Sequence, residues 1–376
     1  MIQKDMNYTQ RNLALISLFR LGVDTRIEES NMDIRFFSFR STSFANKQTI
    51  IPSEDRNISE NISFQYPAFL PHGIKRANKV IILQHGLNER NWNKYLTWAE
   101  YLCSKTGKPV ILFPIAFHMN RSPASWSNPR ALQLLLESRK KKYGEDRSLS
   151  FANVALSERI GEKPFRFYSS GRQSLDDLTQ LALEIKQRNH PLFTAETQID
   201  VFSYSIGAFL SQITFMTNPL GLFSDSKLFM FCGGGIFSSM VGESRAIMDK
   251  PAFAKLLKYY TSDFAAEKAN KAVRDKGFES FRSMISPEWN QPERETFFNK
   301  LGNRIRGISL AKDKVIPYSG VVKALGTSCA DKRIELLDFP FQYSHENPFP
   351  TTMQTDTTTI DASFTTVFDN ASQFLA

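Results

Sequence analysis

Continuous apolar segments without alternating polarity recur along this chain of 376 residues. They constrain its fold more than any other feature, because such segments fit strands that are covered on both faces. Segments with helical spacing lie between them, as at 91–107 and 206–217. This alternation predicts an α/β fold, a doubly wound and mostly parallel sheet with helices on both sides. The segments expected to contain strands are 79–86, 109–117, 197–205, 227–235, 304–317 and 333–340.

Several helices are expected from end signals or from apolar spacing. Gly107 is a C-terminal stop for the first of them, and Ser174 is a candidate N-cap for a helix over 174–189. Apolar spacing predicts an amphipathic helix over 9–23 and a closing helix over 362–376. The polar stretch around RSPASWSNPR is expected to be irregular.

The first 77 residues differ in pattern from the rest of the chain. Segments 33–41 and 61–69 are rich in β-forming residues, and a polar loop separates them. We therefore expect residues 1–77 to be an extension that packs on the main domain. The α/β core is expected to comprise 78–236 and 304–376.

The connection over 237–303 is far longer than the roughly 2–6 residues that usually join a strand to a helix. Its composition indicates helices, so it predicts an inserted helical cap over the C-terminal edge of the sheet, where it would roof a pocket. Phe253, Leu257 and Tyr260 share one amphipathic face of this insertion. That face fits either packing of the cap on the core or contact with a substrate.

Composition and charge exclude several classes of function. The chain has 47 Lys and Arg against 38 Asp and Glu, a net charge of +9. The basic residues are scattered among acidic ones, and no nucleic-acid-binding module is visible. We therefore expect no nucleic-acid partner.

Cysteine usage and hydropathy bear on the compartment. Cys103, Cys232 and Cys329 form neither a disulfide framework nor a CxxC pair. The first segment lacks a secretory layout, because Arg20 interrupts its apolar part. No apolar run approaches the roughly 20 residues that a membrane helix needs. These features predict a cytoplasmic location and no membrane span.

Ser205 stands between the strand expected over 197–205 and the helix expected over 206–217. In a strand–serine–helix turn, a strained backbone pushes Oγ out at the C-terminal edge of the sheet. The residues two before and two after the serine approach closely and must be small, and here they are Ser203 and Gly207. A serine that only caps a helix start fits the same short motif.

This turn resembles the nucleophile elbow of the α/β-hydrolase superfamily, whose usual pattern is G-x-S-x-G. The chain departs from the pattern at Ser203, which stands in place of the first glycine. The resemblance covers residues 78–376, and the segment 114–126 is similar to an uncharacterised bacterial branch. It implies a hydrolase fold with Ser205 as the nucleophile.

The stretch LQHGLNERNW follows the first core strand and is similar to the oxyanion loop of these hydrolases. The resemblance implies that the backbone N–H of Ile206, together with that of Leu87 or Gly86, stabilises a tetrahedral oxyanion. It also implies that His85 holds the loop in place.

Asp313 and His345 complete the resemblance. Asp313 ends the segment ISLAKD and is similar to the acid-bearing turn of the family, although aspartate also caps turns without any catalytic role. Of the five histidines, His345 alone lies after both Ser205 and Asp313. The order serine, aspartate, histidine is that of the hydrolase fold.

The resemblance implies a Ser205–His345–Asp313 triad that cleaves an ester, thioester or amide through an acyl-enzyme. It implies a small-molecule acyl substrate, with no metal or organic cofactor. Arg121 and Trp126 follow the second core strand and are further candidates for substrate contact, with ordinary surface roles as the alternative. The sequence leaves the oligomeric state open.

Two other functions fit the same residues. Acyl transfer to an alcohol or thiol uses the same triad as hydrolysis. A non-catalytic hydrolase-like module that binds a ligand or a protein is a second alternative, suggested by the imperfect elbow and the N-terminal extension.

Overall fold

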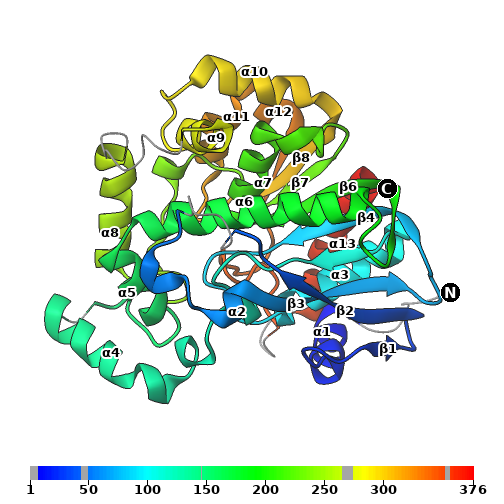
Figure 1. Cartoon of the computed structure of the whole chain (residues 1–376), viewed down its shortest axis with the longest axis horizontal. Coiled ribbons are helices and arrows are strands. Elements are labelled where there is room, and N and C mark those ends of the chain that lie inside the picture. The colour runs from blue at the N-terminus through cyan, green and yellow to red at the C-terminus, as the bar shows by residue number, and fades with distance from the viewer. Residues whose placement is uncertain (1–6, 44–49, 145, 265–273, 352–355) are drawn as a thin grey trace.

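A computed structural model of the chain describes residues 7–43, 50–144, 146–264, 274–351 and 356–376. These residues form a sheet of nine strands in the order β1-β2-β3-β5-β4-β6-β7-β8-β9 (Figure 1). The strands are β1 (Thr25–Ile27), β2 (Met32–Arg40), β3 (Ser63–Pro71), β4 (Ala77–Gln84), β5 (Val110–Leu112), β6 (Phe193–Tyr204), β7 (Leu228–Phe231), β8 (Ile305–Leu310) and β9 (Ile334–Leu337).

The sheet is mixed and mostly parallel. Strands β5, β4, β6, β7, β8 and β9 pair in parallel, with Ile82 of β4 opposite both Ile111 and Val201. Strands β1, β2 and β3 pair antiparallel, and β3 joins β5 through Ala68 opposite Ile111. The strands β1, β2 and β3 of the N-terminal extension therefore lengthen the sheet at one edge.

Helices cover both faces of the sheet (Figure 1). They are α1 (Tyr8–Leu18), α2 (Ser59–Ile62), α3 (Asn93–Thr106), α4 (Pro129–Tyr143), α5 (Val154–Glu162), α6 (Phe165–Lys186), α7 (Ile206–Thr217), α8 (Lys250–Lys258), α9 (Lys276–Ser283), α10 (Gln291–Leu301), α11 (Tyr318–Leu325), α12 (Thr327–Arg333) and α13 (Thr357–Leu375). Shorter helical turns span Ser53–Asp55, Met119–Arg121, Ala124–Trp126, Pro219–Gly221, Phe237–Ser239, Tyr259–Asp263 and Gly302–Arg304.

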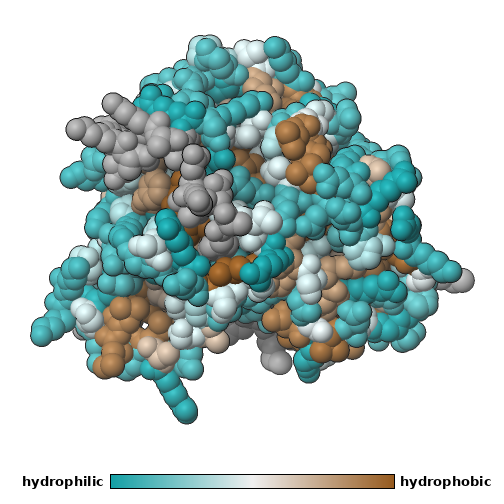
Figure 2. Space-filling model, in the orientation of Figure 1, coloured by the Kyte–Doolittle hydropathy of each residue, from teal (hydrophilic) through white to brown (hydrophobic). Residues whose placement is uncertain are grey.

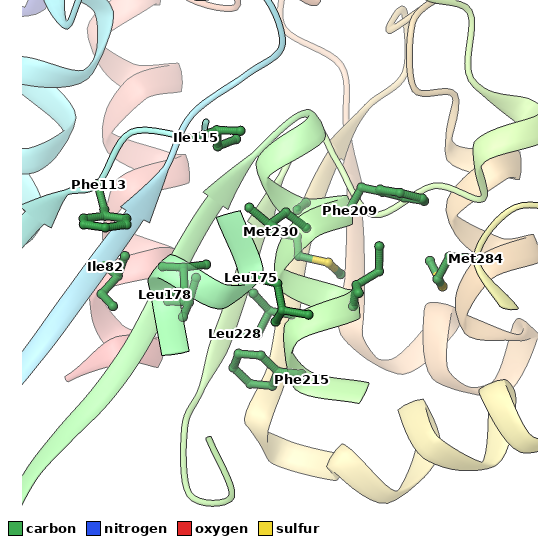
Figure 3. Close-up of a cluster of buried hydrophobic side chains, with 14 of the residues drawn as sticks. Ile82, Phe113, Ile115, Leu175, Leu178, Phe209, Phe215, Leu228, Met230 and Met284 are labelled. Carbon is green, nitrogen blue, oxygen red and sulfur yellow. The ribbon is translucent and has the colours of Figure 1, made fainter. Parts of the chain in front are cut away.

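The continuous apolar strands bury both of their faces. On one face, Ile82 of β4 belongs to the same hydrophobic cluster as Leu178 of α6 and Phe209 of α7 (Figure 3). On the other face, Leu83 belongs to a second cluster that includes residues of α1, α3 and α13. Trp98 of α3 belongs to that second cluster, is fully buried, and its ring contacts those of Phe202, Phe231 and Phe368. The predicted doubly wound α/β architecture is thus confirmed.

Several predicted element boundaries are wrong. Helix α6 begins at Phe165, so Ser174 lies inside the helix, where its hydroxyl donates to the carbonyl of Ser170 and accepts the N–H of Ala116. The strand expected over 109–117 is limited to β5, because the chain leaves the sheet after Leu112.

The helical region beside the sheet has two sources in the sequence. Helices α8, α9 and α10 come from the predicted insertion, of which residues 265–273 lie outside the described part of the chain. Helices α4 and α5 come from the stretch that was expected to be irregular, and α5 packs on α8 (Figure 1). Helix α10 packs instead on α11 and α12, at the side of the core.

Hydrophilic residues predominate on the face of the molecule shown in Figure 2. On the face shown in Figure 2, hydrophobic residues form separate small patches among hydrophilic ones. Within the described ranges, none of the helices combines the length and the apolar character that crossing a membrane requires.

Candidate active site

Ser205 occupies the sharp turn between β6 and α7. Its φ of 58° and ψ of −126° lie in a region that side-chain-bearing residues rarely adopt, at a cost of about 1–3 kcal/mol. The turn is enforced by close packing, since a Cβ on Gly207 would lie 2.7 Å from the carbonyl oxygen of His85. A Cβ on Gly233 would lie 2.9 Å from the carbonyl oxygen of Ser205. The surrounding fold therefore fixes the strained serine.

Ser203 occupies the position where the hydrolase pattern has glycine, and the turn accommodates it. Its side chain is buried, and its hydroxyl donates to the backbone carbonyl of Phe229 on the neighbouring strand at 3.1 Å. The hydroxyl thus has a partner within the sheet. The departure from glycine does not prevent the turn from forming.

His345 lies in the loop between β9 and α13, and its imidazole reaches Ser205. The Nε2 atom is 2.7 Å from Ser205 Oγ. The Tyr204 hydroxyl donates to the backbone carbonyl of His345, and the two rings stack with centroids 5.6 Å apart. Burial raises the pKa of Tyr204 well above its ordinary value, so the phenol remains a protonated donor. Tyr204 thus holds the histidine loop against the serine turn.

Asp313 follows β8 and accepts hydrogen bonds on both carboxylate oxygens. Its Oδ1 accepts the backbone N–H groups of Val315 and Ile316, each at 2.9 Å. Its Oδ2 lies 2.7 Å from Nδ1 of His345. Because a carboxylate only accepts, Nδ1 carries the proton and Nε2 is left to accept from the Ser205 hydroxyl. The structure thus brings the three predicted side chains into one hydrogen-bonded chain.

The candidate oxyanion donors are the backbone N–H groups of Ile206, Leu87 and Gly86. Ile206 is the first residue of α7, where N–H groups have no intrahelical partner. Within the part of the chain that the structure describes, the N–H of Leu87 makes no hydrogen bond. Gly86 is wrong as a candidate, because its N–H donates to the Tyr95 hydroxyl at 2.9 Å.

His85 is buried beneath this loop and is neutral. Its Nε2 accepts the backbone N–H of Ile115 at 2.9 Å, and its Nδ1 donates to the carbonyl of Gly86 at 2.8 Å. Burial lowers its pKa well below the ordinary value. The ring therefore ties the loop to the chain that follows β5, as the resemblance implied.

Ser205 opens into an apolar pocket, called here the Ser205 pocket, of about 430 Å³ with the space open to solvent included. Its lining includes Leu87 and Ile206, together with Phe253 and Leu256 of α8. A second cavity, the outer chamber, has about 1130 Å³ counted in the same way. Leu87, Phe167 and Ile206 line both cavities, so the two adjoin.

The structure separates the predicted substrate-contact residues. Phe253 lines the Ser205 pocket and Trp126 lines the outer chamber. Leu257 packs against the hydrophobic core and lines neither cavity. The prediction that Tyr260 contacts the substrate is wrong, because Tyr260 is fully buried and its hydroxyl donates to the carbonyl of Pro164. The same prediction for Arg121 is also wrong, because Arg121 is fully buried and forms an ion pair with Asp177 at 2.6 Å.

Residues 42–376 match the sequence model of DUF6051, a family of unknown function. The chain belongs to DUF6051. A search of curated proteins found no match.

Solved structures resemble this DUF6051 member at low sequence identity. A thermostable esterase from Pseudomonas putida ECU1011 is 9% identical with a TM-score of 0.50, over 96% of this chain and 87% of the esterase. An esterase from Pyrobaculum calidifontis is 10% identical with a TM-score of 0.46, over 98% and 90%. Carboxyl esterase 2 from Tuber melanosporum is 8% identical with a TM-score of 0.48, over 97% and 96%. The likeness to the Pseudomonas esterase and the mostly parallel sheet show that the chain has the α/β-hydrolase fold.

Residues 241–248 of this DUF6051 member, called here the bridging segment, contact all three loops of the site. The backbone N–H of Val241 donates to the carbonyl of Val315, in the loop that carries Asp313, at 2.8 Å. Ser244 Oγ donates to the carboxylate of Glu346, which adjoins His345. The hydrogen bond from Ser244 helps to lower the pKa of Glu346 against the opposing effect of burial.

The third link of the bridging segment reaches the oxyanion loop through Asn88. Asn88 Nδ2 donates to the carbonyls of Ala152 and Ala246, each at 2.7 Å. Asn88 has a φ of 60°, a conformation that asparagine tolerates better than most residues. Sequence reasoning missed Asn88, Tyr204 and Ser244, because no motif signals hydrogen bonds between segments so far apart in the chain.

Proposed function

We propose that this DUF6051 member is a serine hydrolase that cleaves a carboxylic ester, thioester or amide through an acyl-enzyme. The observation that carries the proposal is the chain of hydrogen bonds from Ser205 Oγ to His345 Nε2 and from His345 Nδ1 to Asp313 Oδ2, each 2.7 Å long. Such a chain lets an imidazole accept the proton of an alcohol as the alcohol attacks a carbonyl.

The first half-reaction forms the acyl-enzyme. Ser205 Oγ attacks the substrate carbonyl carbon while its proton moves to His345 Nε2, and Asp313 stabilises the resulting imidazolium. The carbonyl oxygen becomes an oxyanion, which the N–H groups of Leu87 and Ile206 stabilise. The intermediate then collapses, and the leaving group departs with the proton from His345.

The second half-reaction releases the acid. His345 Nε2 takes a proton from a water molecule, and the resulting hydroxide attacks the acyl carbon. The bond from the acyl carbon to Ser205 Oγ breaks, and the proton on His345 returns to the serine. The carboxylic acid leaves, and both side chains regain their starting protonation.

The surroundings of Ser205 favour a small molecule with an apolar part. The Ser205 pocket is lined almost wholly by apolar residues, among them Phe237, Met240 and Met248. Helix α8 and the bridging segment act as a cap over it. An apolar, partly enclosed pocket with few polar groups is typical of sites that bind small organic ligands.

The test is hydrolysis of a para-nitrophenyl ester by the Ser205→Ala variant of the full chain. We expect kcat to fall by at least about 10⁴-fold, because no nucleophile remains. Ser211→Ala is the matched control. Ser211 is a buried serine of α7 whose hydroxyl donates to the Gly207 carbonyl, and its replacement should change kcat by less than about threefold. Equal rates in Ser205→Ala and the unmodified chain would contradict the proposal.

A further inference from the structure

The wall of the outer chamber contains both apolar and charged residues, and these bear on the class of substrate. Most of its lining is apolar, including Phe117, Phe209 and Leu210. Four arginines also line it, and Glu89 is the one acidic residue among the described residues of the wall. The four arginines are Arg90, Arg159, Arg166 and Arg172.

Three of these arginines have carboxylate partners. Arg159 and Arg166 each lie 2.9 Å from the shared carboxylate of Asp55. Arg166 also pairs with Glu162, and Arg172 pairs with Asp176 and Asp275. These three guanidinium groups therefore have their charge compensated inside the protein.

Glu89 does not compensate the fourth arginine. Its carboxylate forms an ion pair with Lys94 and accepts a hydrogen bond from the Tyr95 hydroxyl at 2.9 Å. The acidic residue of the wall is therefore held by its own partners on α3.

Arg90 differs from the other three. It is half-buried, and among the described residues no carboxylate lies within ion-pair distance of it. Its Nη2 donates to the carbonyls of Phe151 and Ala152, while Nε and Nη1 make no hydrogen bond to any described residue. Burial lowers its pKa, although a guanidinium remains charged near neutral pH. Of the four arginines, Arg90 thus carries a positive charge that no described residue compensates, and its Nε and Nη1 remain available as donors.

Arg90 lines the outer chamber, which adjoins the Ser205 pocket. It lies in the same loop as Leu87, the expected oxyanion donor, and Leu87 lines both cavities. A molecule that extends from the Ser205 pocket into the outer chamber enters the cavity whose wall includes Arg90. A charged hydrogen bond in a partly buried site is stronger than a neutral one.

We propose that the substrate is an amphipathic anion, an ester-type molecule whose apolar part occupies the outer chamber and whose carboxylate binds Arg90. This inference rests on the proposed function, because it assigns the substrate class of the Ser205 site. Arg90 is the specificity-determining residue for the anionic group.

The experiment compares two para-nitrophenyl esters of equal chain length, the neutral hexanoate and the anionic half-ester of adipic acid. We measure kcat/KM for both with the full chain and with Arg90→Gln and Arg90→Lys. We expect the ratio of anionic to neutral kcat/KM to fall about tenfold in Arg90→Gln, which loses the charge. Arg90→Lys should retain the ratio within about threefold, because it keeps the charge.

Arg159→Gln is the matched control, because Arg159 lines the same chamber with its charge already paired to Asp55. In Arg159→Gln, the ratio of anionic to neutral kcat/KM should stay within about twofold of the ratio in the unmodified chain. An equal loss for both esters in Arg90→Gln would overturn the inference and leave Arg90 as a loop support. Values of kcat/KM that match those of the unmodified chain for both esters would also overturn it. Ser205-dependent hydrolysis of the neutral ester tests the proposed function by itself, so the two failures are distinguishable.

Discussion

At the scale of single residues, the site depends on how the carboxylate of Asp313 is divided between its partners. One oxygen accepts two backbone N–H groups, and the other faces the Nδ1 of His345. The carboxylate therefore selects the tautomer whose Nε2 can accept the proton of Ser205. An imidazole in the other tautomer cannot accept that proton.

Because the two carboxylate oxygens of Asp313 have different partners, the effect of Asp313→Asn can be predicted. The amide oxygen would keep the two N–H groups of Val315 and Ile316, so the amide NH₂ would face His345 and donate to Nδ1. The imidazole would then carry its proton on Nε2, and we expect kcat for ester hydrolysis to fall about 10³–10⁴-fold.

The control for this prediction is Asp338→Asn. Asp338 is exposed, and its carboxylate contacts Lys312 and Tyr343 and makes no hydrogen bond to His345, so its replacement should leave kcat within about twofold. Retention of kcat in Asp313→Asn would contradict the tautomer argument.

Sequence reasoning located part of the site and missed the rest for identifiable reasons. It brought together Ser205, Asp313 and His345, because their order along the chain follows the order of the parallel strands. It placed Arg121 wrongly, because an arginine in a loop gives no sign that Asp177 will bury it. The wrong choice of Gly86 has a similar cause, since only the structure shows the Tyr95 hydroxyl at its N–H.

At the scale of elements, the bridging segment holds three loops that come from distant parts of the sequence. Its link to the oxyanion loop depends on the Asn88 side chain, which donates to Ala152 and Ala246. Asn88 itself lies outside the proposed chemistry. It is therefore a positioning residue for the N–H of Leu87.

This role predicts that Asn88→Gly lowers kcat about tenfold with little change in KM, because the oxyanion donor loses its fixed position. Glycine retains the positive φ, so the substitution removes the amide without adding backbone strain. Steady-state kinetics with one ester measures both constants. An unchanged kcat would show that the oxyanion loop keeps its position without this link.

Element boundaries were predictable where a local signal exists. Gly107 ends α3 in the left-handed conformation, as expected for a helix stop. The start of α6 was missed, because Pro164 gives it no side-chain cap and because Gly171, a weak helix former, lies near its beginning. Helices α4 and α5 lie in a polar stretch whose apolar face packs within the helical region, which the sequence does not reveal.

At the scale of the whole molecule, buried neutral histidines link stability to pH. His190 lies between the Tyr66 hydroxyl at 2.9 Å and the N–H of Leu192 at 3.1 Å. Burial lowers the pKa of His190 to about 4, and that of His118 to about 4 as well. An unfolded histidine has a pKa of about 6.5. Between these values the unfolded chain binds protons that the native protein does not.

The free energy of unfolding should therefore fall as the pH is lowered from about 6.5 towards 4. The contribution of each buried histidine is fully present above pH 6.5, with a slope of at most about 1.4 kcal/mol per pH unit. Urea unfolding of His190→Phe at several pH values should show a shallower slope in this window than the unmodified chain. An identical slope would contradict a neutral, buried His190.

Only the parallel half of the sheet was predictable from the sequence. Apolar runs indicated β4, β6 and β7, because strands buried on both faces lack alternation. The participation of β1, β2 and β3 in the same sheet was not predictable, since the antiparallel pairing of β3 with β5 depends on a contact between residues far apart in the chain.

The most direct test of the central claim is labelling of the full chain with a fluorophosphonate, followed by peptide mapping with mass spectrometry. An activated serine attacks the phosphorus and becomes covalently modified, whereas ordinary serines do not react. The account predicts one adduct, on Ser205, that is lost in Ser205→Ala and forms far more slowly in Asp313→Asn. An unmodified Ser205 under conditions that label a known serine hydrolase would contradict it.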